Sequence, residues 1–198
     1  MPLRPARAAV VLLGCVVLPA GAGEPAPTDD WAVRSRAVAD QLTSELKGEL
    51  GAAMAAGGPV AAIEVCRTRA PLIAAKLSSA SGAEVRRTAL RVRNPANAPD
   101  DFERAVLGRF ARDLEQAPQP PAQPPDIQVE WPTLAAGGVD RFYMRAIVMQ
   151  PQCLPCHGPT LAPEVAAAIR HSYPADRATG FEPGQLRGAI VVRWPADR

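Results

Sequence analysis

The sequence predicts an α+β domain in which helices come first and antiparallel strands follow. Two helical patterns of apolar residues cover 30–56 and 59–77, and three segments with alternating side chains cover 127–131, 139–149 and 186–194. Helices followed by several strands favour an antiparallel sheet over a βαβ arrangement. Residues 23–198 number about 176, which suffices for one domain with a hydrophobic core.

Residues 1–22 have the composition of a signal peptide. Arg4 and Arg7 precede an apolar run, and Ala20-Gly21-Ala22 has the small-x-small form of a cleavage site. The apolar run is shorter than the roughly 20 residues that a membrane helix needs, so no transmembrane segment is expected in the mature chain. We therefore expect export to the periplasm, with a lipid anchor at Cys15 as the less favoured alternative.

The first predicted helix, 30–56, is opened by Asp29 or Asp30 and ends at Gly57-Gly58. Its inward positions are Val38, Leu42, Leu46 and Leu50. Pro59 suits the first turn of a second helix. The apolar stripe of that helix is Ile63, Cys66, Ala70, Ile73 and Leu77. The two helices are expected to pack together, with Cys66 facing the interior.

A strand is predicted over Val85–Arg93. Its alternation places Arg87, Ala89, Arg91 and Arg93 on a solvated face, with Arg86 as the exception on the apolar face. Asp100 and Glu103 resemble a capping box that opens the next helix. Apolar residues of that helix are Phe102, Val106, Phe110 and Leu114. Residues 117–125 contain five prolines and are predicted to form a stiff connector or surface loop.

Charge excludes a polyanionic partner. The chain has 22 Lys and Arg against 20 Asp and Glu, and residues 1–22 contain two arginines and no acid. The mature chain is therefore formally neutral, and no nucleic-acid partner is expected.

The segment Cys153-Leu154-Pro155-Cys156-His157 has the spacing of a covalent haem c site. Two thiols close on the vinyl groups of one haem, and the histidine that follows binds its iron. With Cys15 removed, Cys66 remains as a lone thiol in an oxidising compartment. Cys66 is either a small buried hydrophobe or a further ligand.

Several motifs occur in the order found in one known family. They are Glu64-Val65-Cys66 with Ala70-Pro71, Arg87-Thr88 leading into residues 91–97, Cys153 to Gly158, and Tyr173 to Asp176 with residues 178–180 and 187–189. Together they resemble the PAS-like c-type haem domain, long carried as a domain of unknown function and also found as the sensory part of membrane receptors. Phe181 and Gln185 depart from the family pattern, in which a tyrosine and an acid are common.

The resemblance implies a PAS-like fold, one covalent haem per chain, and ligation of its iron by His157 and Cys66. Rival sixth ligands are His171 and the methionines Met54, Met144 and Met149. Arg86, if partly buried, is a candidate partner for a haem propionate, although it also suits an ordinary surface position.

Two other kinds of site use the same residues. Cys153, Cys156, Cys66 and His171 would suit a zinc site, and Cys153 with Cys156 would suit a redox disulfide. Both leave His157 without a role. Near the motif, no second histidine or pair of carboxylates suggests an acid or base, so enzyme activity is not expected.

The sequence therefore predicts an exported monohaem protein that responds to redox state or to a diatomic gas. The alternative is a low-potential periplasmic electron-transfer protein that exchanges electrons with a redox partner protein.

Overall fold

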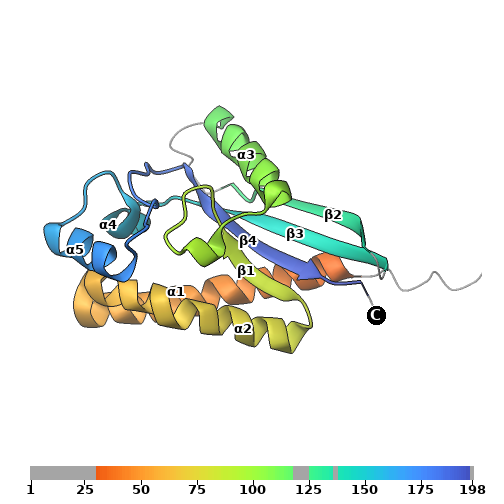
Figure 1. Cartoon of the computed structure of the whole chain (residues 1–198), viewed down its shortest axis with the longest axis horizontal. Helices are drawn as coiled ribbons and strands as arrows, with labels where there is room; N and C mark the ends of the chain where they lie inside the picture. Colours follow the sequence, from red (N-terminus) through yellow and green to blue (C-terminus); the bar gives the residue numbers. More distant parts are fainter. Residues whose placement is uncertain (1–29, 118–124, 136–137, 197–198) are drawn as a thin grey trace, which may run out of the picture.

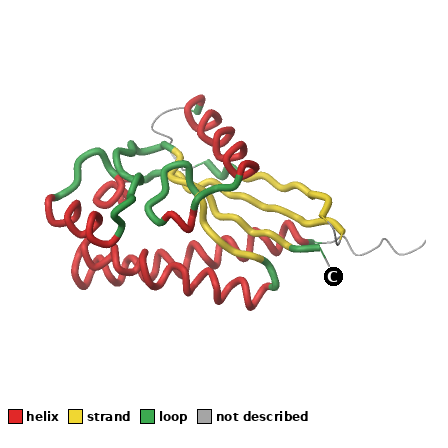
Figure 2. The backbone as a smooth tube through the Cα atoms, viewed as in Figure 1, coloured by secondary structure: helices red, strands yellow, loops and turns green. Residues whose placement is uncertain are grey.

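The computed structural model describes residues 30–117, 125–135 and 138–196 (Figures 1 and 2). Its helices are α1 (Trp31–Glu64), α2 (Ala70–Ser81), α3 (Asp101–Gln116), α4 (Leu154–His157) and α5 (Pro163–Ser172), with a π-helical turn (Val65–Arg69) between α1 and α2. Its strands are β1 (Glu84–Thr88), β2 (Gln128–Ala135), β3 (Gly138–Val148) and β4 (Leu186–Trp194). The predicted signal peptide, Cys15 and most of the predicted proline-rich connector lie outside the described residues.

The strands form one antiparallel sheet in the order β1-β4-β3-β2. The predicted α+β class, with helices packed on an antiparallel sheet, is confirmed. The predicted strand 186–194 coincides with β4, and the predicted strand 139–149 differs from β3 by one residue at each end.

The two helices predicted at the start of the fold are present, and they meet at a kink. Gly57 and Gly58 have non-helical backbone angles inside α1, and Gly58 has a φ of 66°, a conformation that favours glycine. Pro59 follows in the first turn after the kink. The predicted inward stripe is buried at Ile63, Ala70, Ile73 and Leu77, whereas Cys66 is half-buried.

Helices cover both faces of the sheet (Figures 1 and 2). On one face, α1 and α2 contribute Leu42, Ile73 and Leu77 to a core with Tyr143 and Val192. On the other face, α3 packs through a second core, whose members are Leu107, Phe110, Met144, Ala189 and Val191. By length and composition alone, the helical segment Trp31–Ser81, which the kink at Gly57-Gly58 divides, contains the one described stretch that could cross a membrane.

The strand predicted over Val85–Arg93 is shorter than expected, because β1 ends at Thr88. The prediction that Ala89 and Arg93 are solvated is wrong, since they are only 5% and 6% exposed. After β1 the chain leaves the sheet, so the alternation no longer reports which side faces solvent. Arg93 turns inward because the interior supplies a carboxylate and backbone carbonyls for its guanidinium.

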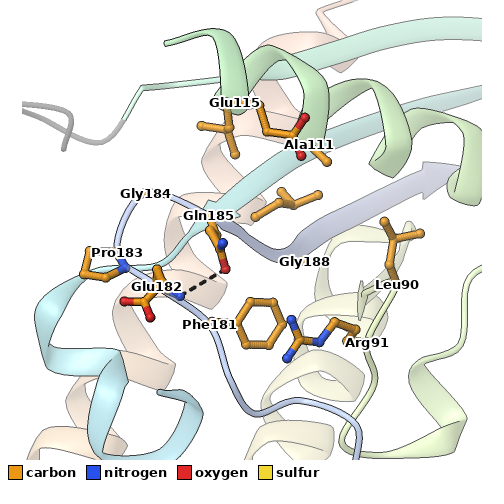
Figure 3. A pocket seen from close by; sticks show the side chains of 12 residues that line it. Leu90, Arg91, Ala111, Glu115, Phe181, Glu182, Pro183, Gly184, Gln185 and Gly188 are labelled. Carbon is orange, nitrogen blue, oxygen red and sulfur yellow. Dashed lines mark hydrogen bonds between the residues drawn. The ribbon is translucent and has the colours of Figure 1, made fainter. Parts of the chain in front are cut away.

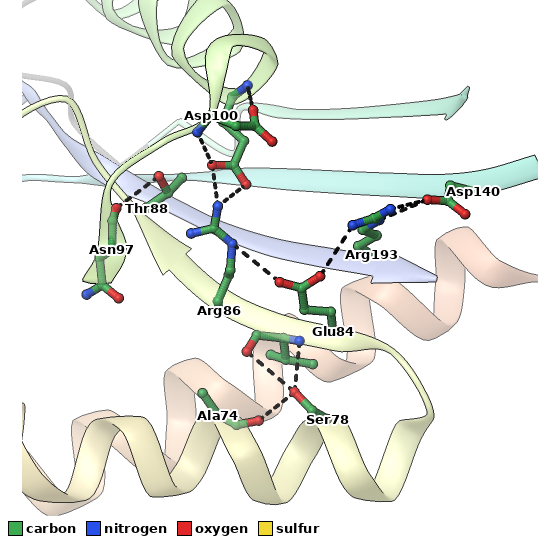
Figure 4. A network of polar contacts seen from close by, with 11 residues as sticks. Ala74, Ser78, Glu84, Arg86, Thr88, Asn97, Asp100, Asp140 and Arg193 are labelled. Atoms are coloured by element: carbon green, nitrogen blue, oxygen red, sulfur yellow. Dashed lines mark hydrogen bonds and ion pairs between the residues drawn. The ribbon is translucent and has the colours of Figure 1, made fainter. Parts of the chain in front are cut away.

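The predicted capping box at the start of α3 is confirmed. The Asp100 carboxylate accepts from the Glu103 N–H at 2.7 Å, and the Glu103 carboxylate accepts from the Asp100 N–H at 3.2 Å. Glu103 also receives Arg86 of β1 at 2.5 and 2.6 Å (Figure 4). Burial raises the pKa of Glu103, and the Arg86 charge opposes that rise. One carboxylate thus joins α3 to the edge of the sheet.

Replacing Glu103 with alanine should lower the free energy of unfolding by about 2–4 kcal/mol, because the variant loses the Glu103 half of the capping box and leaves Arg86 without its buried partner. Urea denaturation followed by circular dichroism measures the change. Glu115→Ala, at an exposed position of the same helix, should change it by no more than about 0.5 kcal/mol. Equal effects of the two substitutions would show that the contact of Arg86 with Glu103 adds little stability.

Candidate functional site

The Cys-x-x-Cys-His segment forms a compact helical turn directly after β3. A 3₁₀ turn (Pro151–Cys153) runs into α4, so the two cysteines stand three residues apart on one side of the chain. Cys153 and Cys156 are half-buried and are not joined to each other. Gly158 follows without a side chain because a Cβ there would lie 2.8 Å from the Leu154 carbonyl oxygen. The segment thus presents two thiols and an imidazole together.

The imidazole of His157 is held in one tautomer. Its Nδ1 lies 2.7 Å from the Ala178 carbonyl oxygen, which only accepts hydrogen bonds, so Nδ1 carries the proton. Burial, followed by the charges of Arg187 and Arg93, lowers the pKa of His157 to about 2. The ring is therefore neutral, and the lone pair of Nε2 is available to a metal. This is the arrangement in which histidine binds metals in proteins.

Arg93 holds together the two segments that carry His157 and its acceptor. Its guanidinium donates to the Asp176 carboxylate at 3.1 Å, to the Cys156 carbonyl at 2.6 Å and to the Ala178 carbonyl at 3.3 Å. Both side chains of the Arg93–Asp176 ion pair are almost completely buried. Asp176 in turn accepts from the Ala178 N–H at 3.0 Å. The ion pair therefore fixes the carbonyl that orients His157.

The lone thiol of Cys66 comes to the same end of the molecule. It lies in the π-helical turn Val65–Arg69, and such turns are frequent at functional sites. Ile63, just before this turn, packs in a buried cluster with Val165, Ile169 and Tyr173. Cys156 borders this cluster, and the charge of Cys66 acts on the pKa values of both Cys156 and Arg187. Burial is the main cause that raises the pKa of Cys156.

Arg187 is a half-buried cation beside this site. It is the extra residue in an irregularity of β4, since Ile147 pairs with Gly188 and Val148 pairs with Leu186. Burial, with the charges of Arg93 and Arg87, lowers the pKa of Arg187 to about 10. Its Nε is fully buried and has no hydrogen-bond partner among the described residues.

An open groove of about 590 Å³ lies next to the site, between the end of α3 and residues 181–188 (Figure 3). Arg91 stacks on the Phe181 ring at 3.9 Å, and the edge-on ring of His157 is 6.4 Å from that of Phe181. Gln185 turns back to accept from the Glu182 N–H at 3.0 Å. Phe181 and Gln185, the two departures from the family pattern, therefore lie at the rim of the site.

Among the rival ligands, Met149 lies at the site itself, in a buried cluster with Ala178 and Phe181 that Cys153 borders. The remaining candidates lie elsewhere, and Met54 is exposed. Arg86 faces α3 and is occupied by Glu103 and Glu84. His171 is exposed at the end of α5, and Met144 lies in the core beneath α3. Within the described ranges, no three His, Cys, Asp or Glu side chains gather closely enough to hold a metal ion by themselves. The residues of the zinc alternative therefore do not form a metal-binding group there.

The sequence model of the Tll0287-like family matches residues 28–195 of this chain. The chain belongs to the Tll0287-like family. Its structure is similar to that of the cyanobacterial haem-protein Tll0287, with 25% sequence identity, a TM-score of 0.62, and coverage of 86% of this chain and 98% of that one. No curated protein matches this chain. The resemblance inferred from the motifs is thereby confirmed at the level of the family.

Sequence reasoning missed the arginines of this family member that surround His157. Arg87 and Arg93 were predicted to face solvent, and Arg187 had no predicted role. The strand-ending Asn94-Pro95 pair was a signal that the alternation would fail near Arg93. Arg187 gave no such signal, because an irregular pairing depends on the partner strand and is not encoded in a local pattern.

Replacing Arg93 with alanine should lower the free energy of unfolding by about 3–5 kcal/mol, because Asp176 would remain buried without a cation. Urea denaturation measures the loss. Arg170→Ala, at an exposed position of α5, should change stability by about 0.5 kcal/mol or less. The double variant Arg93→Ala/Asp176→Ala should regain part of the loss; a double variant that is no more stable than Arg93→Ala would contradict the assigned role of the pair.

Proposed function

We propose that this chain binds one haem c, with Cys153 and Cys156 attached to its vinyl groups and with His157 and Cys66 as the axial ligands of its iron. The observation that carries the proposal is the half-buried, neutral His157, whose Nδ1 proton is committed to Ala178 and whose Nε2 is left for a metal. The relative Tll0287 is a haem-protein, which supports the same assignment.

The residues at this end of the molecule suit a haem better than a bare metal ion. His157 and Cys66 provide two ligands, too few for a zinc site, whereas a porphyrin supplies four nitrogens itself. Two unlinked, half-buried thiols on one helical turn suit two thioether bonds. The buried Nε of Arg187 lacks an acceptor, and haem carries two carboxylates.

When bound, haem supplies a one-electron redox centre and a site for a diatomic gas if an axial ligand leaves. Cys66 as a thiolate would favour the oxidised state and lower the reduction potential. The π-helical turn that carries Cys66 has less regular hydrogen bonding than an α-helix, which supports a ligand that can leave. We therefore favour a redox-responsive or gas-responsive module over a plain electron carrier.

The proposal includes export to the periplasm. Residues 1–22, which have the composition of a signal peptide, support it. It does not include catalysis. Among the described residues, the charges that act on His157 come from Arg187, Arg93 and Arg87, and the carboxylate of Asp176 is committed to Arg93, so the proposal assigns no general base. A diatomic gas or a redox partner protein is the expected interaction partner.

Covalent attachment is tested by producing the chain in a host with a cytochrome c maturation system. The intact mass after denaturation should equal that of the mature chain plus one haem. The double variant Cys153→Ser/Cys156→Ser should lose this added mass, whereas Cys66→Ser should keep it, because Cys66 is not an attachment site. A colourless protein with one zinc ion per chain would refute the proposal.

Ligation by Cys66 is tested by spectroscopy of the ferric protein. The wild type should be low-spin with thiolate character in its electron paramagnetic resonance spectrum, since a thiolate and an imidazole together give a strong axial field. Cys66→Ser should abolish this signature and raise the reduction potential. His171→Ala is the control and should change neither property.

The same two proteins separate a responsive module from a carrier. If Cys66 leaves on reduction, the reduced wild type should bind CO, which visible absorption detects. A carrier would keep both ligands and exclude CO. A Cys66→Ser protein with an unchanged spectrum, together with a His171→Ala protein that is altered, would make His171 the ligand and refute the assignment of Cys66.

A further inference from the structure

The irregular pairing in β4 gives Arg187 an environment different from that of its neighbours. The following residues of that strand, Ala189 and Val191, belong to the core beneath α3. Arg187 instead lies within electrostatic reach of His157, Cys66 and Arg93, close to the Phe181 ring at 5.6 Å. An extra residue in a strand characteristically re-aims a side chain in this way. The pairing of β4 with β3 is thus irregular at Arg187, the residue whose charge lies beside His157.

Arg187 and Arg87 are short of acidic partners. The one hydrogen bond of Arg187 with a described residue runs from Nη1 to the Arg91 carbonyl at 3.3 Å, and its Nε has none. The side chain of Arg87 has no hydrogen bond or ion pair with any described residue, although its charge acts on His157 and Arg187. The nearby acid, Asp176, is already bound to Arg93. Both arginines are half-buried, and withdrawing part of a guanidinium from water without an anion is costly, so an anionic group is expected here.

We propose that Arg187, assisted by Arg87, binds the two carboxylates of the haem, with the guanidinium of Arg187 donating to one of them. This inference rests on the proposed haem function and identifies how the chain recognises that ligand. Two cations without acids match a ligand with two carboxylates, and a guanidinium suits a carboxylate because its N–H groups form a planar fork. Arg86, the candidate from sequence, is excluded from this role by its contacts with Glu103.

The test measures reversible porphyrin binding to the mature chain carrying Cys153→Ser/Cys156→Ser. The probes are haem and haem dimethyl ester, which lacks free carboxylates but keeps the iron. Absorption titrations give a Kd for each probe with the reference chain, with Arg187→Gln, with Arg87→Gln and with Arg109→Gln. Arg109 is an exposed arginine of α3 and serves as the matched control for loss of one charge.

Arg187→Gln should weaken binding of haem about 10-fold to 100-fold, as expected for a lost hydrogen bond to a charged group, and should leave binding of the ester within about twofold. Arg87→Gln should weaken haem binding less, and Arg109→Gln should change neither. Equal losses for haem and ester would overturn the proposal, because they would show that Arg187 only shapes the site. No loss for either probe would overturn it as well.

Failure of the haem function gives a different result. If the reference chain is folded by circular dichroism and binds neither probe, haem binding itself is wrong and the carboxylate assignment falls with it. If Arg187→Gln does not fold, Arg187→Lys is the second variant, because it keeps the charge and loses the fork. It should weaken haem binding and leave ester binding unchanged; equal effects on both probes would again overturn the assignment.

Discussion

The functional end of this molecule depends on how Arg93 is buried. A guanidinium almost without solvent is stable only when its donors meet acceptors, and Arg93 meets the Asp176 carboxylate and two backbone carbonyls. Those carbonyls belong to Cys156 and Ala178, which are far apart in sequence. The hydrogen bonds that satisfy Arg93 therefore also hold the Cys-x-x-Cys-His segment next to the Ala178 carbonyl, which is the acceptor of His157. The same contacts thus stabilise the fold and position the groups of the site.

Positive charge is the second constraint on this end of the molecule. Burial lowers the pKa of His157 most, and the charges of Arg187, Arg93 and Arg87 lower it further, so the imidazole stays neutral. A neutral ring with a committed Nδ1 proton is what a metal ligand requires. Three cations close together also repel one another, and Asp176 neutralises only one of them. An anionic thiolate at Cys66 and two ligand carboxylates would restore the balance.

Sequence reasoning succeeded where local patterns decide the structure. The capping box at Asp100 and the apolar stripe through Ile63 and Leu77 depend on spacings within one helix, and the structure has both. Sequence reasoning failed for Arg93 and Arg187, because their burial depends on acceptors from distant segments and on the pairing of β4 with β3. Alternation assumes a regular strand, and the site lies where strands end or become irregular.

Two irregular features of the backbone, the π-helical turn at Cys66 and the irregular pairing at Arg187, lie at the candidate site. Hydrophobic cores on both faces of the sheet account for the fold, and neither core needs an arginine at position 187 or a π-helical turn at Cys66. Both features replace regular hydrogen bonding with a less favourable local arrangement, and each one places a side chain of matching chemistry at the same end of the molecule. In the proposed complex the thiolate favours ferric iron, whereas uncompensated arginines favour the ferrous state. The way in which carboxylates neutralise those arginines therefore contributes to the reduction potential, alongside the identity of the axial ligand.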